Sequence, residues 1–363
     1  MGSMSSLRFA LFVIGFFGAN AESNSTSNRE PKLLSLFSIV QFKQGPCVQA
    51  SDTSKRGICM TTQQCTDRSG SASGNCAAGF GVCCGFTLST CGSTVNENCT
   101  YITNPNFPSA TATGSCEYIF SRVCEDLCQI RMDFDNFQTS SPPGAGAADT
   151  QFGDCSISGD VFTATSPTGV NPPVVCGTLS GQHMFVETGT TGDAARINFD
   201  ITSAAATYEI KVTYYQCSSL NKAPANCVQY FTGVSGSFQS YNFQGMVIND
   251  DQNYLTCIRQ ERGYCSIQYS ANTFNLLGDT AATPEANAET IACPDTVVFI
   301  PNLVNSMHCG SKFSTIDADT ISGVVTSQTT PFQVLTIFKD AFGTLTDTMA
   351  TVGYDLQFTQ QPC

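Results

Sequence analysis

The sequence predicts an all-β fold, in which two antiparallel β-sandwich domains follow a small disulfide-rich knot. Apolar and polar residues alternate in several segments, clusters of Gly, Pro, Asn and Ser separate these segments, and no long stretch has the spacing of an amphipathic helix. A period of two between turn residues is typical of short antiparallel strands. Such strands bury their apolar face by packing one sheet on another, which favours sandwiches.

The first 21 residues have the three-part pattern of a secretory signal peptide. Arg8 precedes an apolar run from Phe9 to Phe17, and Ala19-Asn20-Ala21 forms a small-x-small cleavage site. The apolar run is shorter than the roughly 20 residues that a membrane-spanning helix needs. The polar ending TQQPC does not resemble a lipid-anchor signal. We therefore expect a secreted, extracellular protein without a membrane span.

The cysteine content and the charge of the chain limit the functional classes to which it can belong. The chain has 20 cysteines, and an even number in an oxidising compartment indicates disulfides. Two histidines are too few for repeated zinc modules. The net charge is −13 and the sequence contains no run of Lys or Arg, which argues against nucleic-acid partners. Asn24 and Asn98 lie in N-glycosylation sequons, so we expect a glycoprotein.

Residues 22–46 are predicted to be a linker that contains the apolar, β-prone segment 33–42. Residues 47–84 follow, with six cysteines and few large apolar side chains. A segment this short cannot bury enough apolar surface to fold without cross-links. Six cysteines allow 15 pairings, and spacing alone does not choose among them. Cys83 and Cys84 point to opposite sides of an extended chain, so they should bridge to different partners.

Residues 91–217 and 227–363 form an internal repeat, and each half has the size of one all-β domain. The two halves share a cysteine-flanked strand, a Cys-Gly turn and an aromatic-rich last strand. The aligned segments are 116–137 with 257–274, 175–182 with 308–315, and 206–217 with 352–363.

The segment CQIRMDFDNF at residues 128–137 carries acids that suggest a calcium loop. Counting from Asp133, however, the sixth and twelfth positions of an EF-hand loop fall on Gln138 and Gly144, which do not fit that motif. Apolar and charged residues alternate, so the acids should face away from the core. The repeat counterpart CSIQYSANTF has no acid. We therefore interpret the segment as a structural strand.

Two resemblances to known families rest on particular strings of this sequence. The ending FGVCC of the six-cysteine segment resembles the arthropod clip domain. The string CGSTVNENCTYITNPNFPS followed by CEYIF resembles the start of a CUB domain, an extracellular β-sandwich, and CIRQERGYCSIQYS and SGQHMFVE extend that resemblance. The chain as a whole is similar to secreted arthropod CUB-domain proteins, which implies a clip-like knot followed by two CUB-like domains.

The resemblances imply most of the disulfide pairing. The clip-like pattern implies Cys47–Cys83, Cys59–Cys76 and Cys65–Cys84. The CUB-like pattern implies Cys91–Cys116, Cys155–Cys176, Cys227–Cys257 and Cys293–Cys309. The repeat alignment leaves Cys128 and Cys217 over in one half and Cys265 and Cys363 in the other. We hypothesise that each of these pairs is bridged, and Cys99–Cys124 then remains.

Many CUB domains bind calcium, and the resemblance allows this chain to be compared with them. In the second repeat Asp295 and Asp340 fall near expected ligand positions, while the third acid is missing. In the first repeat the expected position falls on Ser158, with Asp160 two residues further on. Two carboxylates bind calcium weakly at best. We expect no cofactor, with Asp295 and Asp340 as weak calcium candidates.

The sequence favours binding over catalysis. His183 and His308 have no motif partner, no serine-protease or H-E-x-x-H motif occurs, and we predict that the protein is not an enzyme. The loops at 139–151 and 278–290 are candidate recognition loops, or simply flexible insertions.

We expect a secreted adaptor that binds extracellular proteins or glycans. The resemblance suggests a place beside an arthropod immune or clotting protease cascade. The alternatives are a structural matrix or cuticle component and an enzyme with an unrecognised site. The ligand and the oligomeric state stay open.

Overall fold

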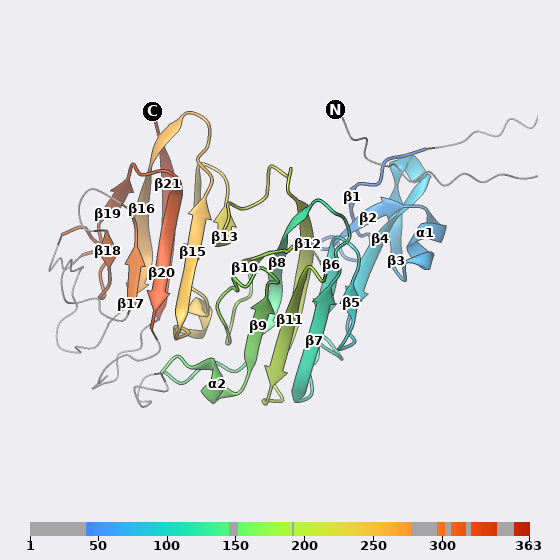
Figure 1. The fold of residues 1–363 in the computed structure, drawn as a ribbon, viewed down its shortest axis with the longest axis horizontal. Coiled ribbons are helices and arrows are strands. Elements are labelled where there is room, and N and C mark those ends of the chain that lie inside the picture. Colours follow the sequence, from blue (N-terminus) through green and yellow to red (C-terminus); the bar gives the residue numbers. More distant parts are fainter. Residues whose placement is uncertain are drawn as a thin grey trace, which may run out of the picture. The chain divides into compact units, whose positions relative to one another are not determined.

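The computed structural model describes residues 41–144, 152–190, 192–276, 296–301, 306–316, 321–339 and 352–363. The predicted all-β fold is confirmed, because nearly all of the regular secondary structure in these residues is strand (Figure 1). No helix of these ranges is long and apolar enough to cross a membrane. The helical elements are α1 (Thr62–Asp67), α2 (Cys155–Ser158) and the short 3-10 helices η1 (Ala77–Gly79) and η3 (Phe243–Gly245).

The knot is a small antiparallel sheet that carries α1 on it. Its strands are β1 (Pro46–Val48), β2 (Arg56–Met60), β3 (Ser71–Cys76) and β4 (Gly81–Leu88). Thr61 begins α1 as a capping box with Gln64. The apolar core of the knot is small among the described residues, with Met60, Cys65, Cys84 and Phe86 buried together, so disulfides supply much of the stability. Gly57 lies so close to β4 that a Cβ there would be 2.4 Å from the carbonyl oxygen of Cys84.

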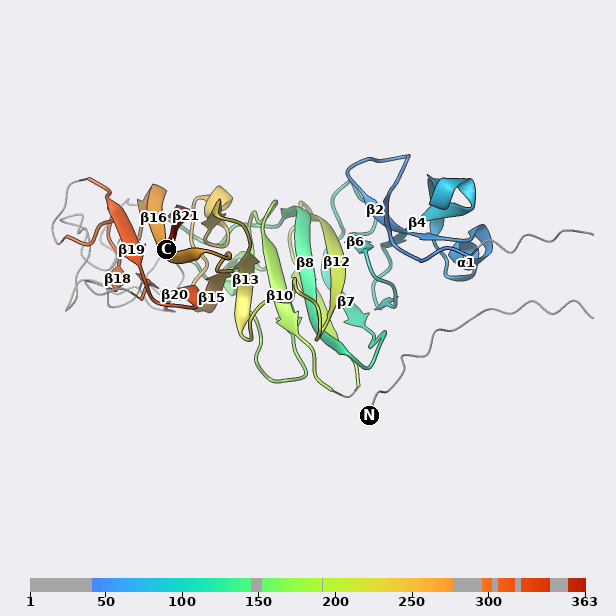
Figure 2. The same cartoon turned by 90° about the horizontal axis from the view of Figure 1, so that it is seen from above.

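The last strand of the knot continues into the first sandwich. Phe86, Thr87 and Leu88 of β4 pair in parallel with Thr100–Ile102 of β6 (Thr100–Thr103). The knot and one layer of the sandwich therefore form one eight-stranded sheet, and β4 crosses the predicted end of the knot at residue 84. The order along this sheet is β1-β2-β4-β6-β12-β8-β10, with β3 paired to β4. Figure 2 shows β10, β8 and β12 side by side at one end of this order.

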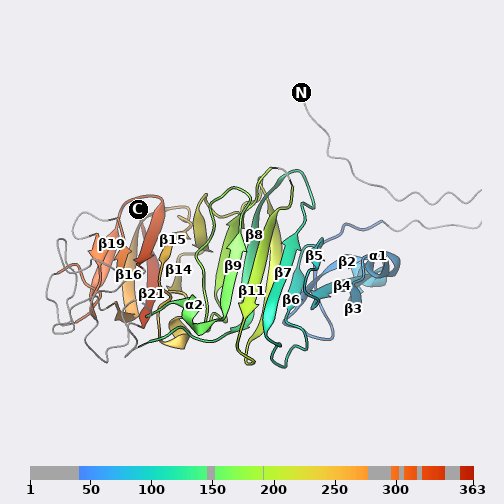
Figure 3. The ribbon, with the colours of Figure 1, turned by 60° about the horizontal axis from the view of Figure 1, so that its bottom comes forward.

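The first sandwich packs that sheet against a four-stranded sheet in the order β5-β7-β11-β9 (Figure 3). Ile130, Met132 and Phe134 of β8 face the core, as their alternation predicts. The large buried rings include Phe162, Phe199 and Tyr208. The remaining strands are β5 (Thr94–Val95), β7 (Gly114–Phe120), β8 (Leu127–Gln138), β9 (Val161–Thr165), β10 (His183–Glu187), β11 (Ala195–Ile201) and β12 (Thr207–Gln216).

The second sandwich repeats this plan with a separate core. Its two sheets have the orders β13-β15-β20-β17-β18 and β14-β21-β16-β19. β16 pairs with the last strand β21 as β8 pairs with β12, which agrees with the sequence repeat. The strands are β13 (Cys227–Phe231), β14 (Ser235–Gln239), β15 (Gln252–Ile258), β16 (Tyr264–Asn275), β17 (Thr296–Phe299), β18 (Met307–His308), β19 (Val324–Ser327), β20 (Phe332–Phe338) and β21 (Gly353–Pro362).

The two sandwiches meet where β10 and β13 lie at the edges of their sheets, a region we call the seam. Nε2 of His183 accepts a hydrogen bond of 3.0 Å from the backbone N–H of Tyr230. The hydroxyl of Tyr241 donates to the carbonyl oxygen of His183 at 2.9 Å. Gln129 exchanges two hydrogen bonds with the backbone of Ala223. Side chains thus form hydrogen bonds with backbone N–H and carbonyl groups at the sheet edges, which would otherwise be open to pairing with another chain.

Candidate functional site

Two adjoining hollows lie at the sheet of the first sandwich that carries β8, β10 and β12, one on its face and the other between β10 and the second sandwich. The larger, here called the charged groove, has a volume of about 650 Å³, and the smaller, the seam pocket, about 210 Å³. Gly181 and Gln182 line both, so the two hollows are neighbours. The charged groove is lined by Pro46, Arg56, Cys99, Arg131, Asp133, Phe134, Asp135, Gly181, Gln182, Lys211, Thr213 and Tyr215.

The strand alternation explains the charged floor of the groove. Arg131, Asp133 and Asp135 of β8 alternate with core residues, and Lys211 and Tyr215 of β12 do the same. The antiparallel register places Lys211 directly opposite Asp133. Side chains on one face of paired strands lie side by side, so these charges are held together by the frame of the sandwich.

Asp133 is the centre of the charges in the groove. Its Oδ1 lies 2.6 Å from Nη2 of Arg131, and its Oδ2 lies 3.7 Å from Nζ of Lys211. The guanidinium of Arg131 also lies 5.5 Å from the ring centre of Phe185. These contacts fix the Arg131 side chain in one position, since a paired and stacked guanidinium has little freedom.

Two further charges of the groove have no ionic partner within the described ranges. They are the guanidinium of Arg56, which comes from the knot, and the carboxylate of Asp135. Loss of hydration raises the pKa of Asp135, and the nearby charge of Asp133 adds to this effect. An unpaired cation and an unpaired anion in one groove are free to bind a ligand.

The knot wall of the groove is attached by specific contacts. The hydroxyl of Tyr101 accepts a hydrogen bond of 2.8 Å from the backbone N–H of Arg56. Lys55 forms an ion pair with Glu209 of β12, and its Nζ lies 5.2 Å from the ring centre of Tyr101. Burial raises the pKa of Tyr101 to about 12, so the phenol stays protonated. The position of Arg56 is therefore fixed relative to β8 and β12.

The predicted bridge between Cys99 and Cys124 is not formed, because both cysteines are free thiols in the structure. Cys99 lines the charged groove on the outer face of the sheet, beside Lys211 and Tyr215. Cys124 packs against the core between the two sheets. Pairing these two as the last cysteines left over was therefore wrong. Burial raises the pKa of Cys99, which keeps it a thiol rather than a thiolate.

Eight other predicted bridges are present, with Cα atoms 4.9–5.9 Å apart. Cys309 is also disulfide-bonded, and its predicted partner Cys293 lies outside the described residues. The eight bridges are Cys47–Cys83, Cys59–Cys76, Cys65–Cys84, Cys91–Cys116, Cys128–Cys217, Cys155–Cys176, Cys227–Cys257 and Cys265–Cys363.

The calcium candidates Asp295 and Asp340 both lie outside the described residues, so they stay predictions. In the first sandwich the carboxylate of Asp160 is fully buried and accepts four hydrogen bonds. Its donors are the backbone of Ser140, Thr202 and Ser203 and the hydroxyl of Ser203. Burial alone would raise the pKa of Asp160, but these hydrogen bonds lower it overall. The four donors occupy the positions that a cation would need.

Neither histidine has the surroundings of a catalytic base. Burial lowers the pKa of His183 to about 3 and that of His308 to about 4. Nε2 of His183 is occupied by Tyr230 at the seam. Nδ1 of His308 lies 3.0 Å from the carbonyl oxygen of Ser314, and its Nε2 has no hydrogen-bond partner among the residues that the structure describes. A base must be within hydrogen-bond reach of the proton that it takes up, and neither ring faces the charged groove.

The remaining candidates from the sequence are two glycosylation sites and two loops, and several of these lie wholly or partly outside the described residues. Asn24 lies outside the described residues. Asn98 is half-buried, and its Oδ1 accepts hydrogen bonds from the backbone of Cys99 and Tyr214, so its glycosylation stays a prediction. The loop 139–151 is described only to residue 144, and the loop 278–290 lies wholly outside the described residues.

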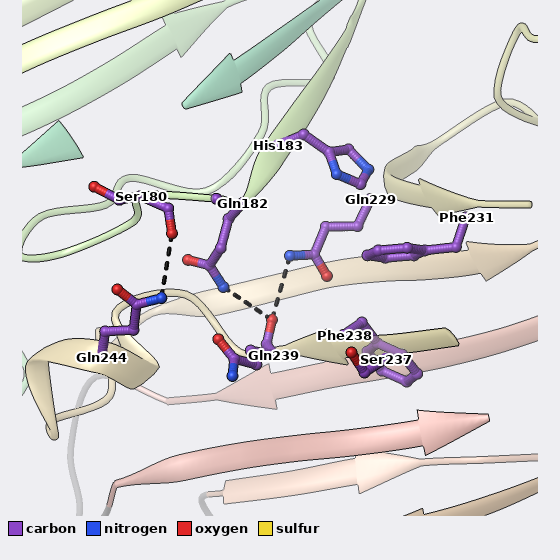
Figure 4. Close-up of a pocket in the computed structure, with 10 residues that line it drawn as sticks. Ser180, Gln182, His183, Gln229, Phe231, Ser237, Phe238, Gln239 and Gln244 are labelled. Carbon is purple, nitrogen blue, oxygen red and sulfur yellow. Dashed lines mark hydrogen bonds between the residues drawn. The ribbon is translucent and has the colours of Figure 1, made fainter. Parts of the chain in front are cut away.

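The seam pocket has a different chemical character from the groove. It lies between β10, β13 and β14, and Figure 4 shows the amides of Gln182 and Gln229 converging on the backbone oxygen of Gln239. No charged residue lines it. Its lining residues are Ser180, Gly181, Gln182, His183, Gln229, Phe231, Ser237, Phe238, Gln239 and Gln244.

Sequence reasoning missed both hollows. Arg56, Arg131 and Lys211 are far apart in the sequence, and the absence of a Lys/Arg run concealed their cluster. The outward direction of Asp133 and Asp135 is confirmed, but they also line a groove, so their strand is more than structural. The usable signal was the alternation itself, because it placed charges of β8 and β12 on one face.

Comparison with known proteins identifies one of the two sandwiches. The family model "Animal CUB domain" matches residues 224–361, which is less than half of the chain and coincides with the second sandwich. No curated protein matches the sequence.

Several solved structures are similar to this chain. The CUB1-EGF-CUB2 domains of rat MASP-1 share 12% identity over 75% of this chain and 99% of that chain, with a TM-score of 0.25. The same domains of human MASP-1/3 share 12% identity over 72% and 98%, with a TM-score of 0.25. The full extracellular region of zebrafish Gpr126/Adgrg6 shares 9% identity over 75% and 36%, with a TM-score of 0.26. These TM-scores are too low to show a common arrangement of the domains.

Proposed function

We propose that this chain, whose second sandwich matches the animal CUB domain, acts outside the cell as a binding protein without enzymatic activity. Its ligand is an extracellular protein or glycan, held in the charged groove of the first sandwich. CUB domains are typically extracellular interaction modules, and many disulfides fit the same compartment. The proposal rests mainly on Arg56 and Asp135. These two opposite charges line the groove without an ionic partner among the described residues, and the rigid strands of the sandwich and the knot hold them in place.

Rigidity supports binding at this place. The floor consists of two central strands, and the knot wall is fixed by the Tyr101 and Lys55 contacts. A preorganised site loses little conformational entropy when a ligand arrives. The volume of about 650 Å³ lies within the range of roughly 300–1,000 Å³ that is usual for ligand pockets.

The same groove argues against catalysis. Its thiol, Cys99, has a raised pKa, whereas a nucleophilic cysteine needs a lowered one. Its central acid, Asp133, is held by two cations. No histidine lines it. These properties suit recognition of complementary charge rather than proton transfer.

Affinity capture from extracellular fluid tests the proposal. The baits are the wild-type protein, the groove variant Arg56→Gln/Asp135→Asn and the control Arg196→Gln/Glu117→Gln. The control neutralises an exposed ion pair of 3.2 Å on β11 and β7, in the opposite sheet. We expect one bound species that the wild type and the control retain and the groove variant loses. Equal retention by all three baits would place the ligand elsewhere and refute the proposal.

The identity of the captured species tests a finer proposal. The resemblance of the sequence to secreted arthropod CUB-domain proteins suggests a component of an immune or clotting protease cascade. Mass spectrometry of the bound species supports this if it finds a protease or protease regulator. A cuticle or matrix polymer would instead favour the structural alternative.

A further inference from the structure

The seam pocket presents hydrogen-bonding groups that carry no charge. Four glutamine side chains, two serines, two phenylalanine rings and a His183 ring that is neutral at ordinary pH line it. Amides and hydroxyls both donate and accept hydrogen bonds, as sugar hydroxyls do. A charged group would lose its hydration here without gaining an opposite charge. The lining therefore suits a neutral, hydroxyl-rich ligand.

Internal hydrogen bonds hold three of the four amides in fixed orientations. Nε2 of Gln182 donates to the backbone oxygens of Gln239 and Ser240 at 3.2 and 2.9 Å. Gln229 accepts from Thr256 at 2.8 Å and donates to the backbone oxygen of Gln239 at 3.3 Å. The Gln244 amide donates to the backbone oxygen of Ser180 at 3.3 Å (Figure 4). The polar wall is thus organised before any ligand binds.

Some polar groups of the pocket remain unused. Oε1 of Gln182 is buried and accepts no hydrogen bond, although its Nε2 donates two. Within the described ranges, the side-chain amide of Gln239 and the hydroxyl of Ser237 also make no hydrogen bond. Gln239 is half-buried and Ser237 is exposed, so both can meet a ligand. A buried acceptor favours a ligand that brings a hydroxyl donor.

The aromatic side of the pocket supplies an apolar surface. Phe231 is half-buried, and its ring centre lies 4.9 Å from that of His183 and 5.8 Å from that of Phe238. The face of an aromatic ring is electron-rich and attracts polarised C–H groups. A sugar ring has polar edges and C–H-bearing faces, so it matches an amide wall beside an aromatic one.

From this arrangement we infer that the seam pocket is a binding subsite for one neutral sugar unit, a hexose or an N-acetylhexosamine. Its hydroxyls bond to Gln182 and Gln239, and one face of its ring lies on Phe231. The volume of about 210 Å³ is below the range of roughly 300–1,000 Å³ for drug-sized ligands, which suits a single ring. Because Gly181 and Gln182 also line the charged groove, the rest of a glycan can continue there. Only this continuation rests on the proposed function of the groove.

Saturation-transfer NMR on the whole protein tests the subsite. The probes are methyl mannoside, methyl galactoside and N-acetylglucosamine, with glucuronic acid and N-acetylneuraminic acid as charged comparisons. A single sugar should bind with a Kd of about 1 mM. We expect transfer to at least one neutral probe and none to the charged probes. Absence of transfer to every neutral probe, or a preference for the charged ones, would overturn the inference.

Three variants locate the binding. Gln239→Leu keeps the side-chain volume and breaks no internal hydrogen bond of the side chain, and Phe231→Leu keeps an apolar group but removes the ring. Gln328→Leu is the control, an exposed glutamine after β19, at the edge of the sheet opposite to β14. We expect each pocket variant to weaken binding about tenfold and the control to bind normally. Unchanged binding by both pocket variants would refute the site.

The groove variant Arg56→Gln/Asp135→Asn separates this inference from the proposed function. If it loses the captured species but still binds the free sugar, the groove and the subsite are both supported. If the wild type captures a species through the groove but binds no neutral sugar, the subsite alone is wrong.

Discussion

Lowering the pH should decrease the free energy of unfolding, and the buried His183 should account for part of this decrease. This ring is 5% exposed, and its Nε2 accepts the Tyr230 N–H at the seam, so it is neutral in the folded protein. Its pKa is lowered by burial to about 3, against 6.5 for an unperturbed histidine. Because the unfolded chain takes up the proton first, the free energy of unfolding is highest above about pH 6.5 and falls as the pH drops toward about 3.

These two pKa values set the size of the effect. Between pH 7 and pH 5 they predict a loss of about 2 kcal/mol from His183 alone. Other groups titrate in the same range, among them His308, whose pKa is about 4. The contribution of His183 is therefore isolated by a variant that keeps its hydrogen bond and does not titrate. His183→Gln is such a variant, since an amide oxygen can accept the Tyr230 N–H.

The assay is urea unfolding of the wild type and His183→Gln at pH 7 and pH 5, followed by circular dichroism. Wild type should lose about 2 kcal/mol more than His183→Gln over this interval. His308→Gln, in the second sandwich, gives a comparison at a histidine that does not lie at the seam. If His183→Gln loses as much stability as the wild type, His183 is not buried as a neutral ring and the account of the seam is wrong.

Three further predictions concern the frame. Asp160→Asn should lower the free energy of unfolding by about 3 kcal/mol, because an amide cannot accept all four hydrogen bonds; an equal loss in the exposed control Asp200→Asn would contradict this. Replacing Cys128 and Cys217 together by Ala should cost about 4–5 kcal/mol, since their bridge closes a loop of 89 residues, and unfolding with urea measures it. Alkylation of the unfolded, unreduced protein should label Cys99 and Cys124; a peptide map that joins them would restore the bridge predicted from the sequence.

The alternation of apolar and polar residues correctly predicted which side chains of a strand face the core. The alternation in Ile130, Met132 and Phe134 is set by the pleat of a single strand, so it can be read without knowing the neighbouring strands. In β20 Val334 and Phe338 are buried, while Leu335 and Ile337 are only partly covered, although all four side chains are apolar. The apolar character of a strand therefore does not show by itself how much structure covers each face of its sheet.

The functional surface could not be predicted in the same way. The groove depends on the register that sets Lys211 opposite Asp133 and on the knot that brings in Arg56. Both are contacts between residues distant in sequence, and a single sequence does not reveal them. The error at Cys99 and Cys124 has the same origin, since elimination counts cysteines but does not tell where in the fold each one lies.

The shared sheet of the knot and the first sandwich has a mechanical consequence. A pull on the chain before Cys47 passes through the Cys47–Cys83 bridge directly into β4, so most of the knot is bypassed. β4 lies parallel to β6, and force along two parallel strands loads their hydrogen bonds together rather than one after another. Force applied before Cys47 would therefore reach β6 of the first sandwich through β4 and would leave most of the knot unloaded.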